Sequence, residues 1–301
     1  MKTSNHLLRR LTAALLAAVL ALSIALPVFA SDDGDTIYIN SVSDLLSLAK
    51  SCAYDQWSVG KTVILQKDLS LEGMLWEPIP SFSGQFKGNG HTISDLTITG
   101  QYSPAGLFGI VEEQGSIESL SVRGIVSVSD SADTTTGGIV GINHGTLINC
   151  QFTGVVTGDS EVGGIVGRNE SEGTIDHSTA RAIVTGKSST GGIAGYNLGA
   201  ITGCTNVGSI NTEYQEASLD TDGFTAKMVD QINNKMAAAD DDATNSVTNV
   251  ATDTGGIAGR SSGMILTSVN TGAVGYEHVG YNVGGIVGRT DGLVSGCCLL
   301  Y

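Results

Sequence analysis

Basic residues are scarce in this 301-residue chain, which has 15 Lys and Arg against 30 Asp and Glu and a formal net charge of −15. Proteins that bind nucleic acids neutralise phosphates with clustered Lys and Arg, and this composition does not supply such clusters. The same deficit disfavours binding to acidic membrane surfaces. Nucleic acid is therefore not an expected partner.

Proline and aromatic residues are also rare, with 4 prolines and 5% aromatic residues. Hydrophobic residues nevertheless make up 41% of the chain, which excludes a disordered protein because there is enough apolar surface to bury. The 41 glycines follow no three-residue period, which excludes a collagen triple helix.

Long apolar runs are absent after residue 30, and residues 1–30 are typical of a signal peptide. Three basic residues precede an apolar run over residues 11–26, which is shorter than the roughly 20 residues of a membrane-spanning helix. A signal cleaved after Ala30 is therefore favoured over a membrane anchor. The leader contains three basic and no acidic residues, so the remaining chain has a net charge of −18. We predict a secreted or cell-wall-associated protein with no membrane contact after cleavage.

Cysteine is infrequent as well, and export would permit disulfides between Cys52, Cys150, Cys204, Cys297 and Cys298. Their odd number and wide spacing do not indicate a disulfide framework. No CxxC or HExxH motif is present, so neither a metal site nor a cofactor is predicted. Buried thiols that pack as small hydrophobic groups are favoured over metal binding or nucleophilic catalysis.

One short repeat dominates the sequence. The pattern Gly-Gly-Ile-[Val/Ala]-Gly begins at residues 137, 163, 191, 255 and 284, with a degenerate copy at Ala105. The interval of 64 residues between the third and fourth starts indicates an insertion over residues 211–253. Runs rich in Ile, Val and Thr, broken by glycine every 26 to 29 residues, are typical of the coils of a solenoid.

The predicted fold is all-β, a right-handed parallel β-helix with coils of 26–29 residues and about three short strands per coil. A helical solenoid is excluded because each glycine would cost about 1 kcal/mol in a helix. The expected domains are the signal peptide 1–30, an N-terminal cap with the first coils at 31–104, and the repeats at 105–301 with the helical insertion.

The N-terminal cap is expected to begin with a short helix over residues 43–52, which covers strand edges that would otherwise invite aggregation. Strands are expected at 62–65, 83–86 and 92–98, with a turn at 87–90.

The insertion contains a second predicted helix, because Phe224, Met228, Ile232 and Met236 recur every four residues. Docking of this helix on the solenoid is favoured over a partner-binding role.

Alignment of the repeats places equivalent residues in columns. A predicted inward-facing stack contains Leu120, Cys150, Ser178, Cys204, Ser268 and Cys297. A predicted hydrogen-bonded ladder, at a turn that tolerates left-handed backbone, contains Asn143, Asn169, Asn197, Ser261 and Thr290. Cys150 and Cys204 lie two coils apart, roughly 9–10 Å, which is too far for a disulfide.

The position just before the ladder holds Arg168, Tyr196, Arg260 and Arg289, with Ile142 as the exception. Three of the five arginines after residue 30 share this position, and successive coils of a β-helix lie about 4.8 Å apart. We predict one stripe of stacked side chains, whose planar guanidinium groups and aromatic face are candidates for recognising acidic surface glycans or a host glycoprotein. Packing of the arginines along their neighbours, which relieves the negative charge, is favoured over this binding role.

Motifs of catalysis are missing. The GGxxG motifs recur, are expected within strands and precede no Lys-Ser/Thr, so they are not phosphate-binding loops. There is no GxSxG nucleophile elbow, and acidic residues occupy no matched positions on successive coils. A non-catalytic protein is favoured, and the alternative is a carbohydrate-active β-helix enzyme, either a polysaccharide lyase or a hydrolase.

The run Gly-Gly-Ile-Val-Gly-x-Asn-x-Gly-x-Ile/Leu-x-x-Cys resembles the GLUG repeat of bacterial surface proteins, including non-catalytic N-terminal regions of immunoglobulin A-specific metallopeptidases. Residues 83–93 and 106–109 resemble the segment that opens such domains. The resemblance covers roughly residues 36–301 and implies an extracellular β-helical module that serves as an adhesive, spacer or stalk on or near the cell surface. The printed residues contain no segment that resembles the peptidase domain or an LPxTG-type sorting signal, so protease activity and covalent anchoring are not expected from them.

The last repeat begins at Gly284 and stops after 18 residues, short of the length of the others. Complete solenoids carry terminal caps. We therefore expect either a fragment of a longer protein or a C-terminal edge covered by self-association.

Overall fold

The structure is a computed structural model that describes residues 35–54, 56–128, 134–212, 251–275 and 280–300. Residues 37–301 belong to one compact unit. The predicted signal peptide and the predicted helix of the insertion lie outside the described residues.

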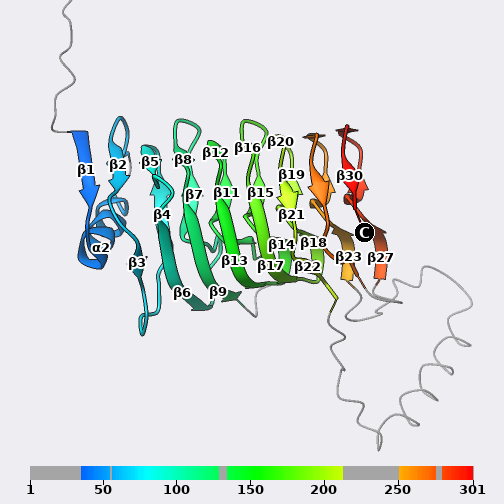
Figure 1. Ribbon diagram of the computed structural model, residues 1–301, viewed down its shortest axis with the longest axis horizontal. Helices are drawn as coiled ribbons and strands as arrows, with labels where there is room; N and C mark the ends of the chain where they lie inside the picture. The colour runs from blue at the N-terminus through cyan, green and yellow to red at the C-terminus, as the bar shows by residue number, and fades with distance from the viewer. Residues whose placement is uncertain (1–34, 55, 129–133, 213–250, 276–279, 301) are drawn as a thin grey trace, which may run out of the picture. The chain divides into compact units, whose positions relative to one another are not determined.

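The compact unit is a parallel β-solenoid in which each strand pairs with the equivalent strand of the next coil (Figure 1). Sheet A contains β1 (Thr36–Ile39), β2 (Thr62–Leu65), β5 (Gln85–Lys87), β8 (Ser116–Glu118), β12 (Thr146–Ile148), β16 (Thr174–Asp176), β20 (Ala200–Thr202), β25 (Met264–Leu266) and β29 (Leu293–Ser295). Sheet B contains β3 (Leu69–Ser70), β6 (Thr92–Gly100), β9 (Ser121–Val128), β13 (Gln151–Thr157), β17 (Thr179–Thr185), β21 (Thr205–Asn206), β26 (Val269–Asn270) and β30 (Cys298–Leu299), while β22 (Ser209–Ile210) pairs with β17.

Two shorter sheets complete the solenoid. Sheet C contains β4 (Ile79–Phe82), β7 (Phe108–Val111), β11 (Val140–Asn143), β15 (Val166–Asn169), β19 (Ala194–Asn197), β24 (Ala258–Ser261) and β28 (Val287–Thr290). Sheet D contains β10 (Thr136–Gly137), β14 (Ser160–Gly163), β18 (Ser188–Gly191), β23 (Ala251–Gly255) and β27 (Gly280–Gly284). The prediction of an all-β parallel β-helix is confirmed.

A central coil has four strands, one in each sheet, and the expectation of about three strands was wrong. β11, β12, β13 and β14 follow one another along the chain and enter sheets C, A, B and D in turn. The repeat motif does not lie within a single strand, because Gly138 and Ile139 form a bend between β10 and β11. The residues just before this corner therefore form an additional short strand of sheet D.

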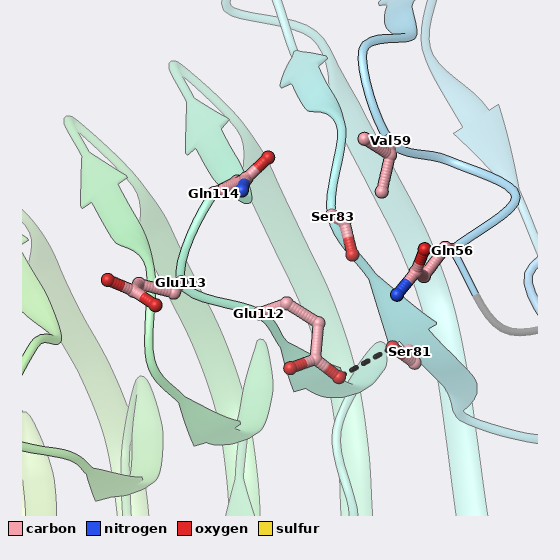
Figure 2. A pocket seen from close by; sticks show the side chains of 7 residues that line it. All are labelled: Gln56, Val59, Ser81, Ser83, Glu112, Glu113 and Gln114. Carbon is pink, nitrogen blue, oxygen red and sulfur yellow. Dashed lines mark hydrogen bonds between the residues drawn. The ribbon is translucent and has the colours of Figure 1, made fainter.

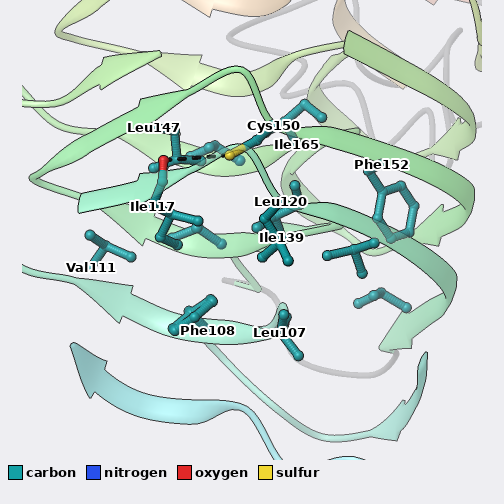
Figure 3. Close-up of a cluster of buried hydrophobic side chains, with 14 of the residues drawn as sticks. Leu107, Phe108, Val111, Ile117, Leu120, Ile139, Leu147, Cys150, Phe152 and Ile165 are labelled. Atoms are coloured by element: carbon teal, nitrogen blue, oxygen red, sulfur yellow. Dashed lines mark hydrogen bonds between the residues drawn. The ribbon is translucent and has the colours of Figure 1, made fainter. Parts of the chain in front are cut away.

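The core is a set of inward-facing columns that run through the coils, part of which is shown in Figure 3. The central column of sheet A is fully buried and almost uniformly branched aliphatic, namely Ile117, Leu147, Ile175, Ile201 and Ile265. The first coils contain larger side chains. The rings of Phe82, Phe86 and Phe108 pack there with centroids 5.4 to 6.3 Å apart. Burial of such side chains contributes about 1.5–3 kcal/mol each.

The N-terminal cap consists of β1 and the helix α2 (Val42–Ser51), at the blue end of Figure 1. The hydroxyl of Ser41 caps the helix by accepting from the Asp44 amide at 3.2 Å, and Leu45 is buried in the core. The strand expected at 83–86 was wrong: β4 ends at Phe82 and β5 begins at Gln85. Gly84 forms the corner between them, where a Cβ would lie 2.7 Å from two carbonyl oxygens.

Left-handed backbone recurs in two columns of equivalent residues. Between sheets A and B it occurs at Ser119, Asn149, His177, Gly203, Thr267 and Gly296, with φ between 46° and 65°. In sheet D it occurs at Glu161, Ser189, Asp253 and Asn282, with φ between 46° and 58°. The asparagine column was expected at a turn of this kind, but Asn143, Asn169 and Asn197 end strands of sheet C in ordinary backbone.

Candidate functional site

The predicted stripe lies on sheet C, where strand register aligns Arg168 with Tyr196, Tyr196 with Arg260, and Arg260 with Arg289. Towards the N-terminus the same column continues through Ile142, Ile110 and Ser81. The first three members are half-buried and Arg289 is exposed. The tertiary structure therefore brings together four side chains that span more than 120 residues of sequence.

Tyr196 is the centre of the stripe. The guanidinium carbons of Arg168 and Arg260 lie 4.9 and 5.0 Å from the centroid of its ring. Because these arginines come from the two strands that flank β19, they cover opposite faces of the ring. These cation–π contacts within the column engage the aromatic face that was expected to recognise a ligand. The Tyr196 hydroxyl lies 3.3 Å from the Ser262 hydroxyl.

Arg168 is neutralised within the protein. Its Nη1 donates to Glu161 at 2.7 Å and its Nε donates to Glu170 at 2.6 Å. Burial by itself would lower the pKa of Arg168, but the hydrogen bonds and charges of Glu170 and Glu161 outweigh it and raise the pKa. The guanidinium is thus firmly charged, and two of its three nitrogens already donate to carboxylates.

One of the repeat glycines, Gly195, allows the ion pair between Glu161 and Arg168 to form. Glu161 lies in sheet D, and its backbone rests directly on Gly195, where any Cβ would overlap the Glu161 carbonyl carbon. The left-handed conformation of Glu161 and a 3.2 Å hydrogen bond from the Thr135 hydroxyl orient its carboxylate. Glycine is needed here because two backbones are in contact.

Arg260 and Arg289 differ from Arg168, because no carboxylate in the described ranges forms a salt bridge with either of them. They occupy adjacent positions of neighbouring strands, about 4.8 Å apart along the solenoid, where like charges disfavour each other. Asp291 lies nearby: a hydrogen bond from Ser262, and then the charges of Arg260 and Arg289, lower its pKa. At this end of the stripe, therefore, the charge of Asp291 acts on both arginines without a salt bridge to either in the described ranges.

The asparagine column forms a continuous buried ladder. The Nδ2 of Asn143 donates to Asn169 Oδ1 at 2.8 Å, and the Nδ2 of Asn169 donates to Asn197 Oδ1 at 2.8 Å. Asn197 then donates to the Ser261 hydroxyl at 3.1 Å, and the Thr290 hydroxyl donates to the Ser261 carbonyl at 2.9 Å. The three amides and Ser261 are fully buried, so this column stabilises the solenoid and offers no ligand site.

The small-residue stack lies inside the corner between sheets A and B. Leu120, Cys150, Ser178, Cys204 and Ser268 are buried, whereas Cys297 is half-buried. The Cys150 and Cys204 amides donate to the hydroxyls of Ser178 and Ser268 at 3.1 and 3.2 Å.

All five cysteines are free, and burial raises the pKa of Cys150 and of Cys204 to about 12. Such thiols stay protonated near neutral pH. No group of metal-ligating side chains occurs among the described residues.

Sequence reasoning missed a second amide pair. The Nδ2 of Asn206 donates to Asn270 Oδ1 at 2.8 Å, and both side chains are fully buried in sheet B. In earlier coils Phe152 and Ala180 occupy this column. The detectable signal was the change from apolar residues to asparagine at one aligned position.

These features define the class of the protein: a parallel β-solenoid whose coils are joined by columns of hydrogen-bonded side chains. Residues 158–185 match the family model described as "The GLUG motif". The match begins two residues before β14 and ends with β17, so it spans one complete coil. The chain therefore carries the GLUG repeat that its sequence resembles.

Two relatives share part of this sequence. Halomucin of Haloquadratum walsbyi is 32% identical over 155 residues, which cover 47% of this chain and 2% of halomucin. A protein of Evansella cellulosilytica named "Putative Gly-rich membrane protein" is 29% identical over 137 residues, which cover 33% of this chain and 16% of that protein. The chain thus spans only a small fraction of these relatives.

The fold is shared with a solved structure, a "putative immunoglobulin A1 protease from Bacteroides ovatus". The match has a TM-score of 0.52 and 16% identity, and covers 88% of this chain and 74% of the other. This likeness shows the fold alone. Within the described part of the chain, no helix has the length and apolar character to cross a membrane.

Proposed function

We propose that the chain is a non-catalytic, surface-associated β-helix module that serves as an adhesive spacer. Support comes from the column architecture itself, in which sheet pairing, the asparagine ladder and the small-residue stack connect each coil to the next. The GLUG match and the relatives named as a mucin and a membrane protein favour a location at the cell surface.

The adhesive function is assigned to the Arg260–Arg289 end of the stripe. The side chains of Glu161 and Glu170 already satisfy Arg168, and guanidinium groups already cover Tyr196. Arg260 and Arg289 are adjacent cations that form no salt bridge among the described residues, and Asp291 is the carboxylate beside them. A ligand carboxylate between the two guanidinium groups would relieve their repulsion further and accept charge-assisted hydrogen bonds. The proposed ligand class is an acidic surface glycan.

The test measures retention of the full chain on an immobilised polyuronate. The double variant Arg260→Ala/Arg289→Ala is expected to lose retention, while Arg168→Ala, at the same stripe position, is expected to retain it. Circular dichroism checks that all variants keep their fold. Equal retention by the double variant would remove the adhesive assignment. Turnover of a polysaccharide, abolished by substitution of one carboxylate, would instead support the carbohydrate-active enzyme.

A further inference from the structure

A separate cavity of about 430 Å³ lies between the N-terminal cap and the first coils, far along the sequence from the arginines (Figure 2). Its walls come from the segment between α2 and β2, from β4 and the residue after it, and from the turn after β7. The lining residues are Gln56, Val59, Ser81, Ser83, Glu112, Glu113 and Gln114. We call this cavity the cap pocket.

Some of the polar side chains that line the cap pocket face the same space, whereas others point away from it. Figure 2 shows Glu112 directed towards Ser81, with Ser83 and Gln56 facing the same space. The Ser81 hydroxyl donates to Oε1 of Glu112 at 2.7 Å, which orients the carboxylate and leaves its second oxygen available. Glu113, the next residue, is exposed and points away in the same view.

The chemistry of the lining defines the ligand. Carboxylate, amide and hydroxyl groups are present, whereas no Lys, Arg or His lines the cap pocket. An anion would meet uncompensated negative charge there, in a chain of net charge −15. A protonated amine would form a charge-assisted hydrogen bond with Glu112, and neighbouring hydroxyl groups of the ligand would pair with the amide and serine groups.

We propose that the cap pocket binds an amino sugar, with its ammonium group on Glu112 and its hydroxyls on Gln56 and Ser83. This site takes a cation and is independent of the proposed anion site at Arg260 and Arg289. The two sites share the outer face of sheet C, because Ser81 occupies the stripe column three strands before Arg168.

The experiment titrates the full chain separately with glucosamine, glucose, N-acetylglucosamine and butylamine. Binding is measured by calorimetry or by ligand-observed NMR. Glucosamine is expected to bind best, since it alone combines an ammonium group with ring hydroxyls. Binding of glucose or N-acetylglucosamine as strong as that of glucosamine would overturn the role of the charge. Equal binding of butylamine would overturn the sugar assignment.

Two variants, one inside the cap pocket and one outside it, isolate the role of the Glu112 carboxylate. Glu112→Gln keeps an acceptor for Ser81 but removes the charge, and glucosamine affinity is expected to fall about tenfold or more. Glu118→Gln removes the same charge at an exposed residue that does not line the cap pocket, and it is expected to change the affinity less than about twofold. Melting curves control for folding. Equal losses in both variants would show a diffuse electrostatic effect and overturn the site.

Discussion

Neighbouring residues of each coil experience opposite environments at the end of the sheet C strands. Asn169 is fully buried and hydrogen-bonded to both adjacent coils, whereas Arg168, one residue earlier, is half-buried at the outer surface. Tyr196 and Asn197 repeat this arrangement one coil later. Both columns link successive coils, but only the inner one places polar groups where water cannot replace a lost partner. Loss of an inner contact should therefore cost far more than loss of an outer one.

The largest effect is expected from Asn169→Ala. This change leaves the amide of Asn143 and the carbonyl of Asn197 without their ladder partner in the core, and each orphaned group costs about 1–3 kcal/mol. We expect the free energy of unfolding to fall by roughly 3 kcal/mol, measured by urea denaturation. Arg168→Ala, one residue away, is the control. Equal losses for the two variants would contradict the distinction between the columns.

A second test uses pH. The pKa of Cys150 is raised from 9.0 to about 12 by burial, so above pH 9 the unfolded chain loses this proton while the folded chain keeps it. The contribution of this protonated thiol to the free energy of unfolding is therefore fully present below pH 9, and it declines as the pH rises towards 12.

Between pH 8 and 10.5, the wild type should lose about 2 kcal/mol relative to Cys150→Ser, measured by denaturation at each pH. Serine is a suitable replacement because Ser178 occupies the same column in the next coil. Parallel pH profiles for the two proteins would argue against a buried, protonated thiol.

The third test concerns the inner column of sheet D that contains Val162, Thr190 and Thr254, in which a buried hydroxyl lacks a hydrogen-bond partner within the described part of the chain. The Thr190 hydroxyl is buried and has no hydrogen-bond partner among the described residues, while Val162 occupies the equivalent position one coil earlier. Thr190→Val is expected to stabilise the protein by about 1 kcal/mol.

Thr254→Val is the matched variant, because the Thr254 hydroxyl accepts a hydrogen bond from Asn211 at 3.0 Å. It is expected to destabilise by a similar amount. Thermal denaturation of the two variants measures both signs, and the same sign for both would refute the assignment.

The smallest effect is expected in the outer column. Tyr196→Leu removes two cation–π contacts, each of which contributes about 0.5–1 kcal/mol at an exposed site, and should lower stability by about 1 kcal/mol. Arg289→Ala, in the same column but without a ring contact in the described structure, should have almost no effect in the same denaturation assay. A loss above that of Asn169→Ala would reverse the order of the two columns.

Periodicity predicted the columns well because parallel register repeats the environment of each position. The aligned residues Arg168, Tyr196 and Arg260 are paired in the structure, and Asn143, Asn169 and Asn197 form one chain of hydrogen bonds. Which column was left-handed was not predictable from residue type, because Glu161 and His177 adopt that conformation while the asparagines do not. Corner geometry decided this instead.

The sequence by itself determined the solenoid, because a glycine-punctuated repeat of branched residues is compatible with few other ways of burying its apolar positions. Tertiary structure decided which charges remain free. Glu161 precedes Arg168 by seven residues, and it reaches the guanidinium only because sheet D folds back onto Gly195 of the next coil. The cap pocket likewise exists only because segments about 50 residues apart meet beside β4. Backbone contact between coils, which no single repeat encodes, set both outcomes.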